Sequence, residues 1–258
     1  MKNKISSIIN SCGIKDVGFC TFSEVSEKLL DCRALQRIPE NAKTVILLLF
    51  PYKVRESRPQ ILSRYAAVPD YLDIGMRYLK KIAEKLKSEF PSSSFEPFID
   101  NSPIPEVYAA AVAGLGLKGE NGLLINEKYG SFVFIGEIVT DIEIECQNTL
   151  KNCSMCGDCK NACPTGVHGA KCLSSLSQQK NGLTDEDFLL LKQNKILWGC
   201  DICAEVCPLN INAELTYIPE FINGYKDTYE YGEDISGRAY AWRGEKVIKR
   251  NYENLFGM

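Results

Sequence analysis

The sequence of 258 residues has little histidine, no strong charge imbalance and no long apolar run. Lysine and arginine total 30 against 33 acidic residues, and this balance offers no bulk attraction for nucleic acid or an anionic membrane. No segment approaches the ~20 consecutive apolar residues that a membrane span needs. His168 is the single histidine, so proton transfer at any catalytic site must depend on carboxylates or tyrosines.

The pattern at the start of the chain does not predict a secretory signal. Ile5, Ile8, Ile9 and Cys12 recur at helical spacing, which predicts an amphipathic helix, whereas a signal peptide has a continuous apolar region. The 12 cysteines are spaced for metal–sulfur ligation, which the reducing cytosol permits. We therefore expect a cytoplasmic protein with no membrane partner.

Seven cysteines stand in two blocks with the spacing of bacterial ferredoxins. The first block is Cys153-x2-Cys156-x2-Cys159-x3-Cys163-Pro, and the second is Cys200-x2-Cys203-x3-Cys207-Pro. In such a run three thiolates hold one 4Fe–4S cluster, and the cysteine before proline ligates the other cluster. The two blocks therefore predict two clusters close enough to exchange electrons.

Two such clusters need eight thiolates, and the blocks supply seven. Crossed ligation assigns Cys153, Cys156, Cys159 and Cys207 to cluster one, and Cys163, Cys200 and Cys203 to cluster two. The second block lacks its first cysteine, because position 197 is leucine. The candidates for the eighth ligand are Cys172, Cys146, Cys12, Cys20 and Cys32. We choose Cys172, which lies between the blocks, and place Cys146 second.

Structural zinc is the alternative interpretation of the blocks. Zinc also binds thiolates, but it favours two well-separated pairs that close one tetrahedron, which this spacing does not resemble. Cys12, Cys20 and Cys32 are interpreted as small core residues, because free cysteine is among the most buried residue types.

Apolar patterning predicts an α+β protein whose first part is a mixed α/β domain. Strands are expected at 16–20, 44–50 and 95–99, and helices at 70–90 and 103–113. Segments 123–126 and 132–139 are expected to form a hairpin around the turn 127–130. Further helices are expected at 184–192 and near 239–255. The predicted domains are residues 1–145, the double-cluster domain 146–215, and a C-terminal loop and helix at 216–258.

Several short motifs outside the cysteine blocks resemble the epoxyqueuosine reductase family. They are Arg64-Tyr-Ala66, Asp70-Tyr71, Ile99-Asp-Asn-Ser-Pro103, Ala113-Gly-Leu-Gly116, Gly119-Glu-Asn121, Gly130-Ser131, Ile135-Gly-Glu137 and Cys172-Leu-Ser174. Members of that family are cobalamin-dependent reductases related to reductive dehalogenases. The matches follow one another in order from about residue 64 to 210, and the cysteine blocks belong to the same pattern.

This resemblance implies a fold, two kinds of cofactor and an electron route. The first domain would be the nitroreductase-like cobalamin-binding domain of the family, and the ferredoxin-like domain would pack against the corrin. Electrons from a ferredoxin or flavodoxin type donor would pass through cluster one and cluster two to give cob(I)alamin. The sequence has no D-x-H-x-x-G motif, so we expect no histidine ligand on cobalt.

The resemblance also implies individual site residues. Asp100 matches the family's proton donor, although Asp-Asn-Ser-Pro taken alone predicts a turn or a helix cap. The implied cobalamin contacts are Asp100, Leu124, Ile135, Ser174, Cys200 and Asp201, several of them through backbone atoms. Cys172 falls where the family places a ligand of the second cluster. The glycines at 114–122 do not form G-x-G-x-x-G after a strand, which argues against a dinucleotide site.

The chain departs from the family pattern at several points. About fifty residues follow Pro208, too few for the helical-repeat extension that helps the family hold tRNA, so a short form is expected. Leu72, Glu120 and Ser175 replace the histidine, lysine and tyrosine of the family. These changes leave epoxyqueuosine in tRNA or another small electrophile open as the substrate. A two-cluster electron carrier without cobalamin is the alternative function.

Overall fold

The computed structural model describes residues 1–147, 149–167 and 171–258 and divides the chain into two compact units. The first unit comprises residues 1–50, 72–127 and 133–155, and the second comprises 51–71, 128–132 and 156–258. His168 lies outside the described residues. The second unit is thus assembled from three separate stretches of chain. The functional division at 145 and 215 stays a prediction.

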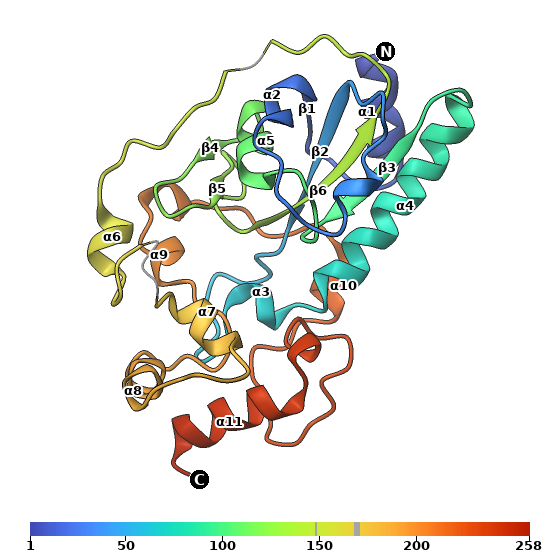
Figure 1. The fold of residues 1–258 in the computed structure, drawn as a ribbon. Coiled ribbons are helices and arrows are strands. Elements are labelled where there is room, and N and C mark those ends of the chain that lie inside the picture. Colours follow the sequence, from blue (N-terminus) through green and yellow to red (C-terminus); the bar gives the residue numbers. More distant parts are fainter. Residues whose placement is uncertain (148, 168–170) are drawn as a thin grey trace. The chain divides into compact units, whose positions relative to one another are not determined.

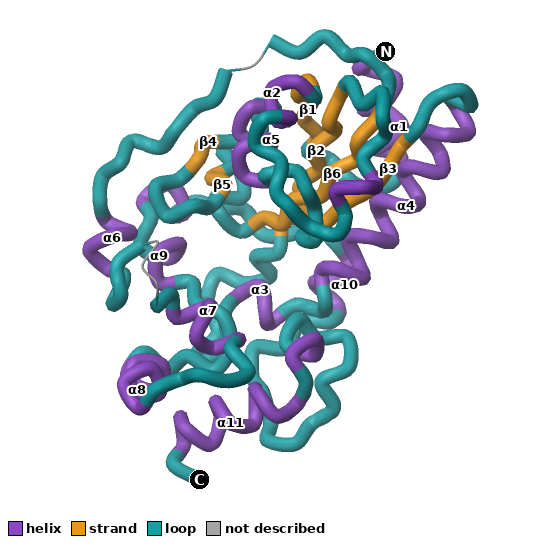
Figure 2. The backbone as a smooth tube through the Cα atoms, viewed as in Figure 1, coloured by secondary structure: helices purple, strands orange, loops and turns teal. Residues whose placement is uncertain are grey.

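The first unit is built on a four-stranded sheet with the order β1-β2-β6-β3 (Figure 2). β1 (Val17–Thr21) is antiparallel to β2 (Thr44–Pro51), and β3 (Phe95–Ile99) is antiparallel to β6 (Val133–Thr140). β4 (Leu117–Lys118) and β5 (Leu124–Ile125) form a separate two-stranded sheet. β2 is buried throughout, as its continuous apolar sequence predicts.

Helices cover both faces of this sheet (Figure 1). The helical elements of the first unit are α1 (Lys2–Ser11), α2 (Ser23–Ser26), the 3₁₀ helix η1 (Leu35–Arg37), α4 (Tyr71–Glu89) and α5 (Glu106–Val112). α4 buries Ile74, Leu79, Ile82 and Leu86 at helical spacing, as expected. Leu79 lies against Gly136 of β6, where a Cβ would come within 2.9 Å of it. α5 and α2 pack with β-strand residues such as Leu47 and Val139 in a second apolar layer.

The expected hairpin between 123–126 and 132–139 is wrong. β5 pairs with β4, whereas β6 lies between β2 and β3 in the larger sheet. The local turn signal was outweighed by burial, because most residues of β6 are buried and a two-stranded hairpin could not bury them. The neighbours of β6 in the sheet are the distant strands β2 and β3, which local sequence does not indicate.

The second unit is mainly helical. Its elements are α3 (Arg64–Ala67), α6 (Asp158–Ala162), α7 (Leu173–Gln178), α8 (Asp185–Gln193), α9 (Ile202–Glu205), η2 (Pro208–Asn210), α10 (Pro219–Asn223), η3 (Ala241–Arg243) and α11 (Glu245–Phe256). Thr184 and Asp187 form the capping box that begins α8. α11 begins later than expected, because Gly244 with φ 83° interrupts the chain after η3. Trp198 and Tyr240 are fully buried in the main apolar cluster of this unit.

Arg64 connects the 51–71 stretch to the rest of the second unit through hydrogen bonds and an ion pair. Its side chain is 6% exposed and its guanidinium forms an ion pair with Glu205. The same group donates to the carbonyl oxygens of Arg55 (2.7 Å) and Glu56 (2.9 Å), and the Arg64 backbone N–H donates to Asp201 Oδ2 at 2.6 Å. A buried guanidinium with this many acceptors is fully compensated. The cation therefore links the first stretch of the unit to the second cysteine block.

Gly199, directly before the second cysteine block, has no room for a side chain. Its φ is 68°, and a Cβ there would lie 2.1 Å from Ser63 Oγ and 2.6 Å from the ring of Tyr65. We expect Gly199→Ala to lower the free energy of unfolding by roughly 2–4 kcal/mol, because left-handed backbone and overpacking both cost energy. Urea titration measures this loss. Gly237→Ala is the matched control, since Gly237 also has positive φ (70°) but faces open space; equal losses in both variants would contradict the packing argument.

Within the described residues no helix combines the length and apolar character needed to cross a membrane.

Candidate functional site

The two cysteine blocks fold as two short helices, each followed by a proline. Cys159 lies in α6 and Cys203 lies in α9, and the two helices pack on each other within the second unit. Cys163 and Cys207 each follow their helix in extended conformation, and the next residue is Pro164 or Pro208. Proline cannot continue a helix, so the last cysteine of each block leaves the turn that holds the others.

Two thiols of the second block have raised pKa values. Burial, with smaller contributions from Asp201, Cys172 and Cys163, raises the pKa of Cys200 to about 11. Burial, with smaller contributions from Cys200, Cys163, Asp201 and Cys172, raises the pKa of Cys203 to about 12. The second unit thus contains the four cysteines predicted for cluster two, and their assignment as its ligands stays a prediction. Thiolates gathered this way repel one another until a metal centre neutralises them.

Cys153, the first predicted ligand of cluster one, belongs to the first unit. Its Sγ accepts a hydrogen bond from the backbone N–H of Glu120 at 3.3 Å, and its own N–H donates to Lys118 O at 3.1 Å. Backbone N–H groups directed at cluster sulfurs are one means of setting a reduction potential. The other predicted ligands Cys156, Cys159 and Cys207 belong to the second unit. Across the described ranges, no three His, Cys, Asp or Glu side chains converge as they would on a single metal ion.

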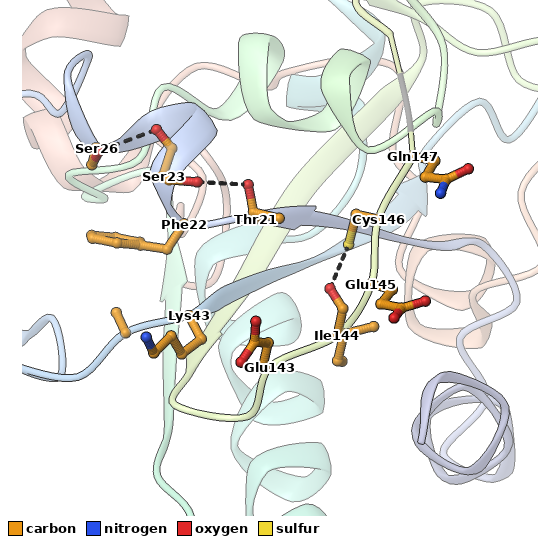
Figure 3. A pocket seen from close by; sticks show the side chains of 11 residues that line it. Thr21, Phe22, Ser23, Ser26, Lys43, Glu143, Ile144, Glu145, Cys146 and Gln147 are labelled. Carbon is orange, nitrogen blue, oxygen red and sulfur yellow. Dashed lines mark hydrogen bonds between the residues drawn. The ribbon is translucent and has the colours of Figure 1, made fainter.

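Cys146, the second choice for the eighth ligand, lies elsewhere in the first unit. Its thiol donates to Ile144 O at 3.2 Å beside an open pocket of about 680 Å³ (Figure 3). Burial raises its pKa, Lys2 lowers it and Glu24 raises it, and Cys146 in turn raises the pKa of buried Cys20. The groups around Cys146 are therefore side chains of the first unit and not block thiols. No other predicted site residue lines this pocket.

Asp100 is held in an unusual turn at the end of β3. Its φ is 58°, the left-handed region that Asp and Asn tolerate better than most residues. Asn101 N–H donates back to Ile99 O, and Ser102 N–H donates to Asp100 O at 2.8 Å. The Asp100 backbone N–H donates to Glu106 Oε1 at 2.7 Å. The residue is exposed, so this turn presents its carboxylate at the surface of the first unit.

Two carboxyls of the first unit interact with Asp100. Glu106 begins α5 and is half-buried, and desolvation raises its pKa to about 7, partly offset by the hydrogen bond from Asp100 N–H. Glu137 in β6 is 0% exposed, and burial together with the charges of Glu106 and Asp100 raises its pKa well above the ordinary value. The Ser102 hydroxyl lowers the pKa of Glu137. One of these carboxyls therefore titrates near neutral pH, and the other holds its proton more tightly.

The raised pKa of Glu137 predicts how stability depends on pH. The folded state binds this proton more tightly than the unfolded state, so stability is complete below about pH 4.5 and is lost as pH rises. Relative to Glu137→Gln, we expect the wild-type free energy of unfolding to fall by about 1.4 kcal/mol per pH unit above that point. Urea titrations between pH 5.5 and 8.5 measure this slope. Glu84→Gln, on an exposed position of α4, should run parallel to wild type; a parallel Glu137→Gln curve would contradict the prediction.

The remaining predicted cofactor contacts are divided between the units. Leu124 and Ile135 belong to the first unit, where they are 2% and 7% exposed in the apolar cluster beneath α5. Ser174 and Asp201 belong to the second unit. Burial raises the pKa of Asp201 to about 6 although Arg64 N–H donates to it. The Tyr65 hydroxyl accepts from Gln178 Nε2 (3.1 Å), and that same nitrogen donates to Ser174 Oγ at 3.3 Å.

The sequence did not identify Glu137, Glu106 or the Arg64 hydrogen-bond network as parts of the site. Glu137 carried a usable signal, because it is the one charged residue in the apolar run 132–139. Glu106 carried none, since an acidic residue in the first turn of a helix is ordinary. The partners of Arg64 are 137 and 141 residues away in sequence and could not be inferred from it.

Fold and site together define an iron–sulfur protein: a mixed α/β unit and a helical unit that carries a double-cluster module. Residues 152–210 match the model of the 4Fe-4S double cluster binding domain, and residues 33–101 match that of Epoxyqueuosine reductase QueG, DUF1730. The expected mixed α/β domain followed by a double 4Fe–4S domain is confirmed.

The chain belongs to the epoxyqueuosine reductase family. The epoxyqueuosine reductase of Leadbetterella byssophila is 32% identical over 83% of this chain and 74% of that protein. The one of Aliivibrio fischeri is 34% identical over 67% of this chain and 48% of that protein. The chain thus spans about half the length of the second relative.

Solved structures share the fold. A crystal structure of an epoxyqueuosine reductase with an epoxyqueuosine-modified tRNA stem loop matches with a TM-score of 0.82 at 23% identity, covering 98% of this chain and 80% of that one. The structure of a reductive dehalogenase, for which a mechanism of B12-dependent dehalogenation was suggested, matches with a TM-score of 0.50 at 15% identity. The match covers 97% of this chain and 37% of that one.

Proposed function

We propose that the chain is a cobalamin-dependent reductase with two 4Fe–4S clusters that removes the epoxide oxygen of epoxyqueuosine in tRNA. A ferredoxin or flavodoxin type protein is the proposed electron donor, and the two clusters held by the block cysteines would supply its electrons to bound cobalamin. The reaction consumes two electrons and two protons, converts the epoxide carbons into an alkene and releases the oxygen as water. The names of the relatives and the tRNA-bound structure supply the substrate class.

One observation supports this function more than any other. The two family models match separate parts of the chain, one ending just after Asp100 and the other containing all eight predicted ligand cysteines. Cys172 lies inside the matched range 152–210, whereas Cys146 lies outside it. A simple two-cluster carrier would need the second part alone. The presence of both parts favours a reductase over a carrier.

The residues present fit the two clusters. Cys153, Cys156, Cys159 and Cys207 would hold cluster one, and Cys163, Cys172, Cys200 and Cys203 would hold cluster two. The contributions of Cys163 and Cys172 to the raised pKa values of Cys200 and Cys203 support this second set.

The residues also fit a cofactor rich in amide groups. The Ser131 hydroxyl is buried and has no hydrogen-bond partner within the described residues, and a buried hydroxyl in that state needs one. Tyr65, Gln178 and Ser174 form a hydrogen-bonded polar cluster in the second unit, which also contains the cysteines predicted for cluster two. We propose Asp100, Leu124, Ile135, Ser174, Cys200 and Asp201 as the cobalamin contacts, the two apolar residues through backbone atoms. Bound cobalamin would supply a low-valent cobalt that reduces the epoxide.

Asp100 is the proposed proton donor. It is an exposed carboxyl held by backbone hydrogen bonds in a fixed turn, and it adjoins Glu106, whose pKa desolvation raises to about 7. A positioned acid of this kind protonates the oxygen as the carbon–oxygen bond breaks.

The test is anaerobic reconstitution with iron and sulfide, followed by cobalamin and gel filtration. We expect the protein fraction to retain a corrin spectrum in addition to the broad iron–sulfur band, and to convert an epoxyqueuosine-containing tRNA stem loop to the queuosine form. A fraction that keeps only the iron–sulfur band would instead identify a two-cluster carrier. Corrin retention without conversion of the stem loop would leave the cofactor in place and refute the tRNA substrate.

A further inference from the structure

Two lysines of the first unit adjoin Cys153, the first predicted ligand of cluster one. Lys118 of β4 forms a parallel bridge with Asn152, and its backbone N–H donates to Lys151 O at 2.8 Å. The Cys153 N–H in turn donates to Lys118 O at 3.1 Å. β4 therefore holds the 151–153 segment at its edge. Lys151 stands two residues before Cys153, and Lys118 is hydrogen-bonded to Cys153 through the backbone.

Both lysines are exposed, and among the described residues neither amine forms an ion pair or a hydrogen bond. Asn152 is exposed as well, and Met155 is 61% exposed. We call Lys118, Lys151, Asn152 and Met155 the Lys118 surface. Glu120 is the one acidic residue in the segments 117–123 and 149–155, and its carboxyl oxygen Oε2 is buried. The exposed charge of these two segments is therefore positive.

An exposed apolar residue beside unpaired cations suits a brief encounter with an acidic protein. Opposite charges speed the association, whereas a small interface lets the partner leave again. A protein that delivers single electrons needs both properties, because the reaction consumes two electrons and such a donor must bind and leave for each of them. Since Cys153 adjoins the Lys118 surface, a donor bound there has a short path to the first predicted cluster ligand.

We propose that the Lys118 surface docks the electron donor and that this donor is a small protein with acidic side chains around its redox centre. In each encounter the donor is oxidised by one electron and cluster one is reduced by one, so two encounters supply one reaction. The inference rests on the proposed function, which requires electrons from outside the chain. RNA fits this surface less well, because the surface has neither arginine for bidentate phosphate contacts nor an aromatic side chain for base stacking.

The test measures how fast a purified acidic flavodoxin, fully reduced, reduces the clusters of the reconstituted protein in a stopped-flow instrument, without cobalamin or stem loop. We expect the wild-type second-order rate constant to fall as ionic strength rises, because salt screens the attraction. The double variant Lys118→Glu, Lys151→Glu should lower it by about tenfold or more at low ionic strength and remove the fall with salt. Glutamine at both positions should give an intermediate rate. The double control Lys80→Glu, Lys81→Glu makes the same charge change on exposed positions of α4 and should match wild type.

Iron content and the electron paramagnetic resonance spectrum after complete reduction with dithionite should be the same in every variant, which shows that the clusters are intact. An unchanged rate in the Lys118, Lys151 variant, or an equal loss in the Lys80, Lys81 control, overturns the docking surface and leaves the reductase standing. An unchanged rate together with weaker stem-loop binding in fluorescence anisotropy also overturns it and assigns the surface to RNA. Wild-type protein that accepts flavodoxin electrons as expected but converts no epoxide supports the docking surface and refutes the proposed function.

Discussion

Replacing Cys172 by serine is expected to remove or damage one of the two clusters. Its thiol contributes to the raised pKa values of Cys200 and Cys203, which favours it over Cys146 as the predicted eighth ligand. A cubane that loses one of four thiolates loses an iron or does not assemble. Iron in the reconstituted protein should fall from about eight atoms per chain toward four to seven, with a 3Fe signal in electron paramagnetic resonance where one iron is lost. Turnover should be lost, because electrons no longer reach the site.

Cys146→Ser is the control for this prediction. Cys146 is half-buried in the first unit, where its thiol donates to Ile144 O. We expect full iron content and an unchanged spectrum in this variant. If Cys146→Ser lowers the iron content and Cys172→Ser does not, the assignment of the eighth ligand is wrong.

Replacing Asp100 by asparagine is expected to lower kcat at least 100-fold and to leave both clusters in place. Removal of a general acid typically costs that much. Asparagine is the proper substitute, because it tolerates the left-handed φ of 58° as well as aspartate does. The loss can therefore be attributed to the proton and not to the turn.

The measurement is stem-loop turnover together with iron content and thermal unfolding. Asp73→Asn, at an exposed position of α4, tests whether loss of one surface carboxylate matters by itself; it should behave as wild type. An Asp100→Asn enzyme with more than half of the wild-type rate would exclude Asp100 as the donor.

Local patterns in the sequence were sufficient for most elements of the first unit. The expected helix at 70–90 corresponds to α4 (Tyr71–Glu89), and the strands at 44–50 and 95–99 correspond to β2 and β3. These elements have strong periodicity and clear stop signals, such as Pro91 after α4. The pairing of β6 with β3 could not be predicted in this way, because it depends on burial across distant strands.

The sequence predicts those site residues whose role requires a fixed spacing along the chain. The cysteine blocks have a fixed interval, which indicates their ligand role directly. Glu106 and Glu137 have no such interval, and their interaction with Asp100 arises only when the chain folds. Likewise, nothing near residue 64 indicates that its arginine joins Glu205 inside the second cysteine block.

That ion pair has a consequence for the order in which the protein is made. Arg64 leaves the ribosome long before Asp201 and Glu205, which follow it by 137 and 141 residues. Until Asp201 and Glu205 have been synthesised, a buried Arg64 guanidinium would have no carboxylate partner. The 51–71 stretch therefore cannot fold into the second unit early. The second unit, with its long-range contacts, therefore closes only after the second cysteine block has been synthesised. Iron and sulfide can be incorporated only after that point.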